Sequence, residues 1–340
     1  MNQPTTNGHS NNDHNNNRPA KGKPAFASQL KLPLIAAPLF LVSGPELVIA
    51  SSKAGIVGTF PALNQRTTEG FAEWLVQIKA ALDPGNGEQP APYGVNLIVH
   101  ATNPRLEADL AVCVEHKVPL VITSLGAVSD VVDAVHSYGG QVFHDVINLR
   151  HARKAAAAGV DGLIAVSAGA GGHAGYISPF ALVNEIRQFF SGQVILSGCL
   201  STGRDLAAAV TMGADFGYMG TRFINTQESR AAEGYRQMIN ESSAADIVYT
   251  DKVSGVNANF LRDSLAKAGM DDATLHDRSD IDFGSELMPD ENGEASAWKD
   301  IWSAGQGVGS IDSVPTVEAL VTQLEADYRA AILEQAATLS

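Results

Sequence analysis

Residues 160–175 read VDGLIAVSAGAGGHAG, a short apolar run that leads directly into a glycine-rich loop. The run at 163–166 is bounded by glycines and is too short for a helix, so it predicts a buried strand. The loop beyond it carries one large side chain, that of His173, among Gly169, Gly171, Gly172 and Gly175. A flat ligand could approach such a backbone closely, and an imidazole beside it is suited to proton transfer. His173 is therefore the candidate catalytic residue, and the alternative is a histidine that only hydrogen-bonds its own loop.

The same pattern, a short apolar run followed by a longer amphipathic one, recurs from Leu32 onward and is typical of βα units around a parallel sheet. Eight such apolar runs occur, at residues 33–38, 56–60, 93–99, 118–124, 141–146, 161–167, 193–198 and 215–220. A (β/α)8 TIM barrel needs about 250 residues. Because the eight units end near Gly220, the pattern favours this barrel over an open doubly wound sheet.

The ends of the chain and one internal segment depart from this rhythm. Residues 1–26 are rich in asparagine and lack an apolar core, so they predict a disordered tail. Residues 226–310 are irregular, helix-prone and acidic, which indicates a helical insert domain beside the active site. The amphipathic run 317–336 then predicts the last barrel helix. On this interpretation the barrel consists of residues 27–225 and 311–340.

Composition limits the functional class. The 340 residues include 23 basic and 37 acidic side chains, and a net charge of -14 argues against nucleic acid or an anionic membrane as a partner. The two cysteines, Cys113 and Cys199, lack the spacing of a metal site or a disulfide framework. No signal peptide or apolar run of about 18 residues is present. We expect a cytoplasmic enzyme that acts on a small molecule and contains no metal. The sequence leaves undecided whether the enzyme is a homodimer.

A phosphate site is expected after strands seven and eight of such a barrel. Gly198 and Gly203 follow the seventh strand, just before a helix whose N-terminal end favours anions. Gly220 and Thr221 follow the eighth, and Arg222 could add charge. No Walker loop is present, so the phosphate is expected to belong to a cofactor rather than to a nucleotide triphosphate, and no G-x-G-x-x-G turn follows the first strand.

Other strand ends offer contacts to a planar ring. Ala37 and Pro38 close the first strand with small or flat side chains, although a proline there could equally be a simple loop entry. Asn96, Ser124 and Ser167 fall at the ends of the third, fourth and sixth strands, where polar side chains can reach a ligand.

The order of these segments resembles the nitronate monooxygenase family, also called 2-nitropropane dioxygenases. The resemblance covers nearly all of residues 32–310 and is carried by AAP at 36–38, GVNL at 94–97, AGGHAG at 170–175, SGCLSTGRDL at 197–206, MGTRF at 219–223 and IWSAGQGVG at 301–309. Flavin-dependent enoyl-acyl carrier protein reductases and certain flavin quinone reductases share most of these segments.

The resemblance implies an FMN-dependent barrel that oxidises alkyl nitronates with molecular oxygen to a carbonyl compound and nitrite. It makes His173 the catalytic histidine and Gln306 a residue that closes over the flavin. It also implies phosphate contacts from Gly198, Cys199, Gly220 and Thr221, and ring contacts from Ala37, Asn96, Ser124 and Ser167. The alternatives are an NAD(P)H-dependent flavin reductase of enoyl thioesters or quinones, and a flavin-binding scaffold without turnover.

Two departures from related sequences affect this transfer. Cys199 follows Gly198 where close relatives often have a second glycine, so its Cβ narrows the approach to the backbone. Asp145 ends the fifth strand where some related flavin barrels carry a basic residue. A carboxylate would not stabilise an anionic reduced flavin, so a positive partner is expected elsewhere or from His144.

Overall fold

The computed structural model describes residues 24–85, 87, 89–100, 102–126, 129–270 and 301–338. Eight parallel strands close into a barrel, and β9 pairs with β1 to complete the ring. In barrel order these strands are β1 (Leu34–Ala36), β2 (Val57–Pro61), β3 (Tyr93–Ile98), β4 (Leu120–Ser124), β5 (Gln141–Val146), β6 (Gly162–Val166), β8 (Gln193–Ser197) and β9 (Phe216–Met219). Each predicted apolar run supplies one strand, so the (β/α)8 barrel is confirmed.

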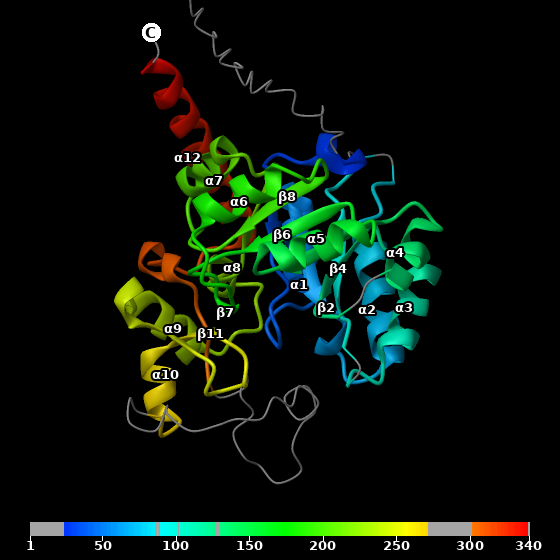
Figure 1. The fold of residues 1–340 in the computed structure, drawn as a ribbon, viewed down its shortest axis with the longest axis horizontal. Coiled ribbons are helices and arrows are strands. Elements are labelled where there is room, and N and C mark those ends of the chain that lie inside the picture. Colours follow the sequence, from blue (N-terminus) through cyan, green and yellow to red (C-terminus); the bar gives the residue numbers. More distant parts are fainter. Residues whose placement is uncertain are drawn as a thin grey trace, which may run out of the picture.

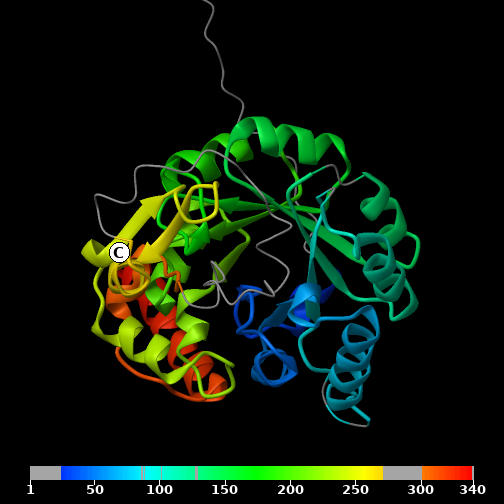
Figure 2. The same ribbon diagram turned by 90° about the horizontal axis from the view of Figure 1, so that it is seen from below.

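Helices surround the strands (Figure 2). Those that alternate with the strands are α1 (Pro45–Ala54), α2 (Thr68–Ala81), α3 (Leu106–Glu115), α4 (Ser129–His136), α5 (Leu149–Ala157), α6 (Pro179–Arg187), α7 (Gly203–Met212) and α12 (Val317–Ala337). Thr67 and Asn148 cap α2 and α5 by accepting backbone N–H groups at 3.0 and 2.9 Å. Gly55 and Gly213 end α1 and α7 in the left-handed conformation. The run predicted as the last barrel helix is α12, which packs on α7 and α1.

Side chains of the barrel strands alternate between the interior and the surrounding helices. The interior is a packed apolar core that includes Leu120, Ile122, Phe143, Ile164, Ile195 and Phe216. A second apolar layer, formed by the outward-facing side chains, joins the strands to the helices. Because the barrel is filled rather than hollow, ligand chemistry is restricted to the ends of the strands.

One end of the barrel is covered by η1 (Ala25–Gln29), a short 3-10 helix coloured blue at the top of Figure 1. Phe26 is buried, and its ring lies 6.5 Å from that of Phe143 and 6.1 Å from that of Phe216. The prediction that residues 1–26 form a disordered tail is therefore wrong for Pro24, Ala25 and Phe26. For residues 1–23 the prediction is not tested, because these residues lie outside the described part of the chain. The error arose because one aromatic residue contributes little to composition yet closes a core.

Deleting residues 1–23 is expected to leave the thermal midpoint and the flavin content unchanged. The deleted segment has too few apolar groups to offset its ordering entropy, whereas the deletion retains Phe26. Thermal unfolding and the flavin-to-protein absorbance ratio measure the two properties. A loss of either would mean that the segment contributes to the fold or to the site.

The segment predicted as a helical insert lies at the opposite end of the barrel from η1 (Figure 1). It contains α9 (Glu233–Glu241) and α10 (Arg262–Lys267), but also β10 (Ile247–Thr250) and β11 (Ala258–Leu261). With β7 (Gly172–His173) these strands form an antiparallel sheet in the order β10-β11-β7. The described part of the insert is therefore mixed rather than helical. Within the described residues, no helix combines the length and apolar character needed to cross a membrane.

Candidate functional site

His173 lies in β7, in the loop that follows β6, and it pairs with Ala258 of β11. Its Nε2 atom lies 3.3 Å from Ser254 Oγ, and this hydroxyl donates to the carbonyl oxygen of Val256 at 3.2 Å. Burial lowers the pKa of His173 to about 4. The imidazole is therefore neutral at neutral pH and able to accept a proton.

Three glycine-containing loops pack against each other beside His173. The N–H of Gln306 donates to the carbonyl oxygen of Gly169 at 2.9 Å, and the N–H of Gly305 donates to Thr221 Oγ1 at 2.9 Å. A Cβ atom at Gly305 would lie 2.6 Å from the Gly169 carbonyl oxygen, which is closer than backbone atoms tolerate. The loop after β6, the turn after β9 and residues 305–306 are therefore hydrogen-bonded and closely packed at this barrel end.

Backbone donors are present after β8 and β9, as expected for a phosphate site. Within the described residues, the N–H groups of Cys199 and Thr221 make no hydrogen bond. Thr221 begins the short helix α8 (Thr221–Ile224). The N-terminus of α7 contributes less than expected, because Asp205 accepts the N–H groups of Ser201 and Thr202 at 2.9 and 2.8 Å. Two free N–H groups on adjacent strand ends fit an anionic group better than the capped helix does.

Cys199 occupies a conformation that favours glycine, with a φ of 57° directly after Gly198 at 125°. A left-handed conformation costs a residue with a Cβ roughly 1–2 kcal/mol. Replacing Cys199 with Gly is expected to raise the thermal midpoint and to retain or tighten flavin binding, because the N–H remains and the Cβ is removed. Thermal unfolding and flavin titration measure both effects. Weaker flavin binding in this variant would show that the thiol itself contacts the cofactor.

A chain of three polar side chains crosses the interior near the C-terminal ends of β3, β4 and β5. Asn96 Nδ2 donates to Ser124 Oγ at 2.9 Å, and Ser124 Oγ donates to Asp145 Oδ2 at 2.6 Å. Burial raises the pKa of Asp145 to about 6, although the bond from Ser124 opposes the shift. The structure thus brings together two residues predicted near a planar ring and the carboxyl group that departs from related sequences.

His144 does not supply the positive charge that was expected because Asp145 occupies the position of a basic residue. Its side chain faces the helices on the outside of the barrel, where its Nδ1 lies 2.8 Å from Thr123 Oγ1. Burial, followed by the positive charge of neighbouring His151 and Lys154, lowers the pKa of His144 to about 4. Its neutral ring and outward direction exclude it as a cation for a ligand at the strand ends.

The remaining predicted residues take several roles. Ala37 is buried against the interior core, and Pro38 follows it at the same barrel end. Gly172 pairs with Asn259 in the small sheet. Ser167 is fully buried and donates to the carbonyl oxygen of Ser197 at 2.8 Å, so its hydroxyl links β6 to β8 instead of reaching a ligand. Gln306 is exposed, with its Oε1 4.0 Å from Cys199 Sγ in the turn after β8.

Two residues of the site were missed from the sequence. Ser254 contacts His173, and Asn259 Nδ2 donates to the carbonyl oxygen of Ala170 at 2.6 Å. Both come from the insert, more than 80 residues after the loop that they hold. The sequence of that insert has no local pattern that points to this contact. The pairing of β11 with β7 alone brings them there.

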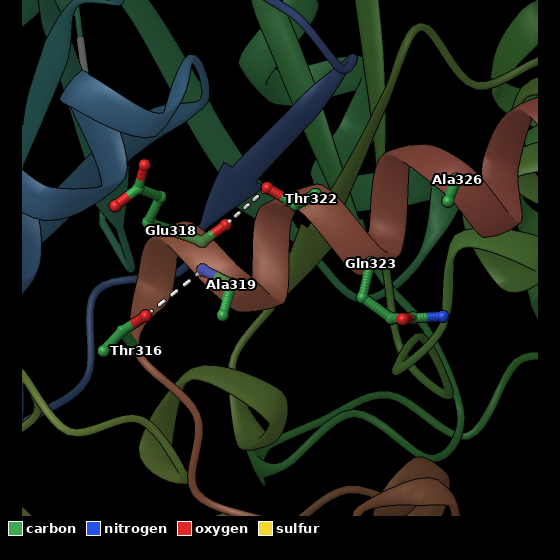
Figure 3. A pocket seen from close by; sticks show the side chains of 6 residues that line it. All are labelled: Thr316, Glu318, Ala319, Thr322, Gln323 and Ala326. Atoms are coloured by element: carbon green, nitrogen blue, oxygen red, sulfur yellow. Dashed lines mark hydrogen bonds between the residues drawn. The ribbon is translucent and has the colours of Figure 1, made fainter.

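Two hollows of the surface lie away from His173. A groove of about 460 Å³ lies along α12. Figure 3 shows the residues that line it: Thr316, Glu318, Ala319, Thr322, Gln323 and Ala326. Two of its hydroxyls are occupied within the helix, where Thr316 accepts the N–H of Ala319 and Thr322 donates to the carbonyl of Glu318. A second cavity of about 740 Å³ lies beside Phe26 and Tyr93, at the starts of the strands. Neither hollow is lined by His173 or by the turns after β8 and β9.

Comparison with known proteins agrees with this geometry. The family model described as nitronate monooxygenase matches residues 25–327, a range that includes the loop with His173, the turns after β8 and β9, and the insert. The chain belongs to the nitronate monooxygenase family. It is a flavin-dependent oxidoreductase with the TIM-barrel fold. The resemblance noted from the sequence segments is thereby confirmed.

Individual relatives of this nitronate monooxygenase family member are distant. A nitronate monooxygenase of Paraburkholderia phytofirmans is 27% identical, over 88% of this chain and 93% of that protein. A (3aS,4S,5R,7aS)-5-hydroxy-7a-methyl-1-oxo-octahydro-1H-indene-4-carboxyl-CoA dehydrogenase of Mycobacterium tuberculosis is also 27% identical, over 69% of this chain and 64% of that protein. A solved FabK variant from Thermotoga maritima has a TM-score of 0.74 and 25% identity, covering 91% of this chain and 96% of that one.

Proposed function

We propose that this chain oxidises alkyl nitronates with molecular oxygen to a carbonyl compound and nitrite, with FMN as its cofactor. The observation that carries the proposal is a neutral, half-buried His173 at the barrel end where, within the described residues, the N–H groups of Cys199 and Thr221 make no hydrogen bond. The family match and the relative from Paraburkholderia phytofirmans support the same reaction class.

The residues present fit a flavin mononucleotide. The N–H groups of Cys199 and Thr221 would hold its phosphate, and Ala37 and Ser124 would lie near its ring. FMN supplies the capacity to accept electrons from the substrate and pass them to oxygen. His173 would orient the nitronate anion, or remove the proton from the carbon that bears a neutral nitro group.

The cofactor is expected to be FMN rather than FAD. The two turns after β8 and β9 provide one phosphate site, and the sequence lacks the glycine fingerprint of a dinucleotide crevice. Acid extraction of the purified protein, followed by chromatography against FMN and FAD standards, identifies the released flavin. Recovery of mainly FAD would overturn this assignment.

The reaction is tested by aerobic mixing of the flavin-loaded protein with propyl-2-nitronate or propionate 3-nitronate. Oxygen uptake accompanied by nitrite release is the expected result. Flavin that stays oxidised under anaerobic conditions with both nitronates would reject the proposal.

The second candidate is an NAD(P)H-dependent reductase of enoyl thioesters or quinones. The match to a carboxyl-CoA dehydrogenase and the likeness to FabK favour it. Anaerobic mixing with NADH and then NADPH separates the two functions, because rapid bleaching of the flavin by either nicotinamide is expected for a reductase alone.

A further inference from the structure

The carboxyl group of Asp145 has a buried oxygen atom, Oδ1, that takes part in none of the functions proposed above. Asn96 Nδ2 donates to Ser124 Oγ, so the single hydroxyl hydrogen of Ser124 is directed to Asp145 Oδ2, 2.6 Å away. Within the described residues, the other carboxyl oxygen, Oδ1, is buried and has no hydrogen-bond partner. One oxygen of this carboxyl group is therefore an acceptor, while the other is unsatisfied.

This arrangement decides where a proton would bind. Because Oδ2 accepts the bond from Ser124, a proton on the carboxyl group lies on Oδ1. A buried, unpaired carboxylate oxygen is costly, so Oδ1 favours either a proton or a donor from a ligand. Burial raises the pKa of Asp145 to about 6, which places this proton exchange close to neutral pH.

Among the described residues, none places a positive charge beside Asp145. Its side chain points into the barrel like that of Phe143, two residues earlier on β5. The flanking strands β4 and β6 carry no titratable side chain, and the charged residues of α4 and α5 lie outside the barrel, where His144 faces them. Within the barrel, Tyr218 of β9 is the titratable neighbour, and burial together with the Asp145 charge raises the pKa of its hydroxyl well above its usual value.

We propose that Asp145 is a second proton-transfer residue of the site, which binds a proton at Oδ1 when the flavin is reduced and releases it when oxygen reoxidises the flavin. The inference rests on the flavin site proposed above. Two electrons pass from the substrate to the flavin and then to oxygen, while one proton comes from solvent and returns to solvent. The O–H bond at Oδ1 forms in the first half of this cycle and breaks in the second. A negative charge on the reduced flavin would raise the proton affinity of a carboxylate beside it. The carboxyl group then becomes neutral, so it does not oppose that charge.

The test is the pH dependence of the flavin midpoint potential between pH 5 and 8. Three proteins are compared: the wild type, Asp145→Asn, and the matched control Asp83→Asn, an exposed residue at the opposite end of the barrel. Above pH 6, the wild type and the control should take up one more proton per flavin reduced than Asp145→Asn does. Equal slopes in all three proteins would overturn the inference.

Ser124→Ala provides a second variant if Asp145→Asn does not retain flavin. It removes the hydrogen bond that favours the charged carboxylate, so the change of slope should move to higher pH. An unchanged position would count against the proton assignment. Nitronate turnover of the wild type is measured separately. If the slopes differ but nitronate is not turned over, the proposed substrate is rejected and the role of Asp145 is supported. If nitronate is turned over but the slopes are equal, the proposed substrate is supported and the role of Asp145 is rejected.

Discussion

Replacing His173 with Asn is expected to lower kcat/KM for neutral nitroalkanes by about 10²- to 10⁴-fold, the usual cost of losing a positioned proton-transfer group. Neutral nitroalkanes must lose a proton from carbon before electrons can leave, whereas preformed nitronates have already lost it. A smaller loss on nitronates than on nitroalkanes is expected if His173 acts mainly as a base. Similar losses on both indicate that it mainly binds the anion.

The pH profile gives an independent check of the same residue. Because burial lowers the pKa of His173 to about 4, its imidazole stays unprotonated at neutral and mildly acidic pH. Rates on nitroalkanes should not fall with His173 protonation until the pH approaches 4. His116→Asn, at the end of α3, is the matched control and should keep both rates. Full activity of a flavin-replete His173→Asn protein would return His173 to a role within its own loop.

The barrel could be predicted from sequence because each strand carries its own evidence. Apolar runs of five to seven residues recur between amphipathic segments, and closure of eight parallel strands follows from their number. The insert could not be predicted in the same way. β10 pairs with β11, and β11 pairs with the two residues of β7. A two-residue strand leaves no periodic pattern in the sequence.

The site shows the same division between local and distant information. The positions of His173 and of the turns at Gly198 and Gly220 could be predicted from the glycines in the local sequence. The direction of a polar side chain at a strand end depends on the alternation of the strand, so Ser124 and Asp145 face the interior while His144 faces outward. Ser167 illustrates the remaining difficulty, because its hydroxyl is consumed by a strand neighbour that only the folded barrel provides.

Phe26→Ala is expected to produce the largest loss of stability among the changes considered, about 3–5 kcal/mol, as for other buried aromatic truncations. Phe26 is 7% exposed and packs against Phe143 and Phe216, so its removal leaves a cavity at the base of the interior core. Phe180→Ala is the matched control, because that ring is 66% exposed and should contribute little.

Chemical denaturation measures the free energy of unfolding of both variants. Since Phe26 lies at the end of the barrel opposite to His173, the folded Phe26→Ala protein should keep its flavin affinity at low temperature and lose flavin in parallel with unfolding on heating. Equal stabilities of the two variants would mean that η1 rests on the barrel without closing its core. A specific loss of flavin affinity in folded Phe26→Ala protein would instead show that packing at the base of the barrel controls the geometry of the site at its other end.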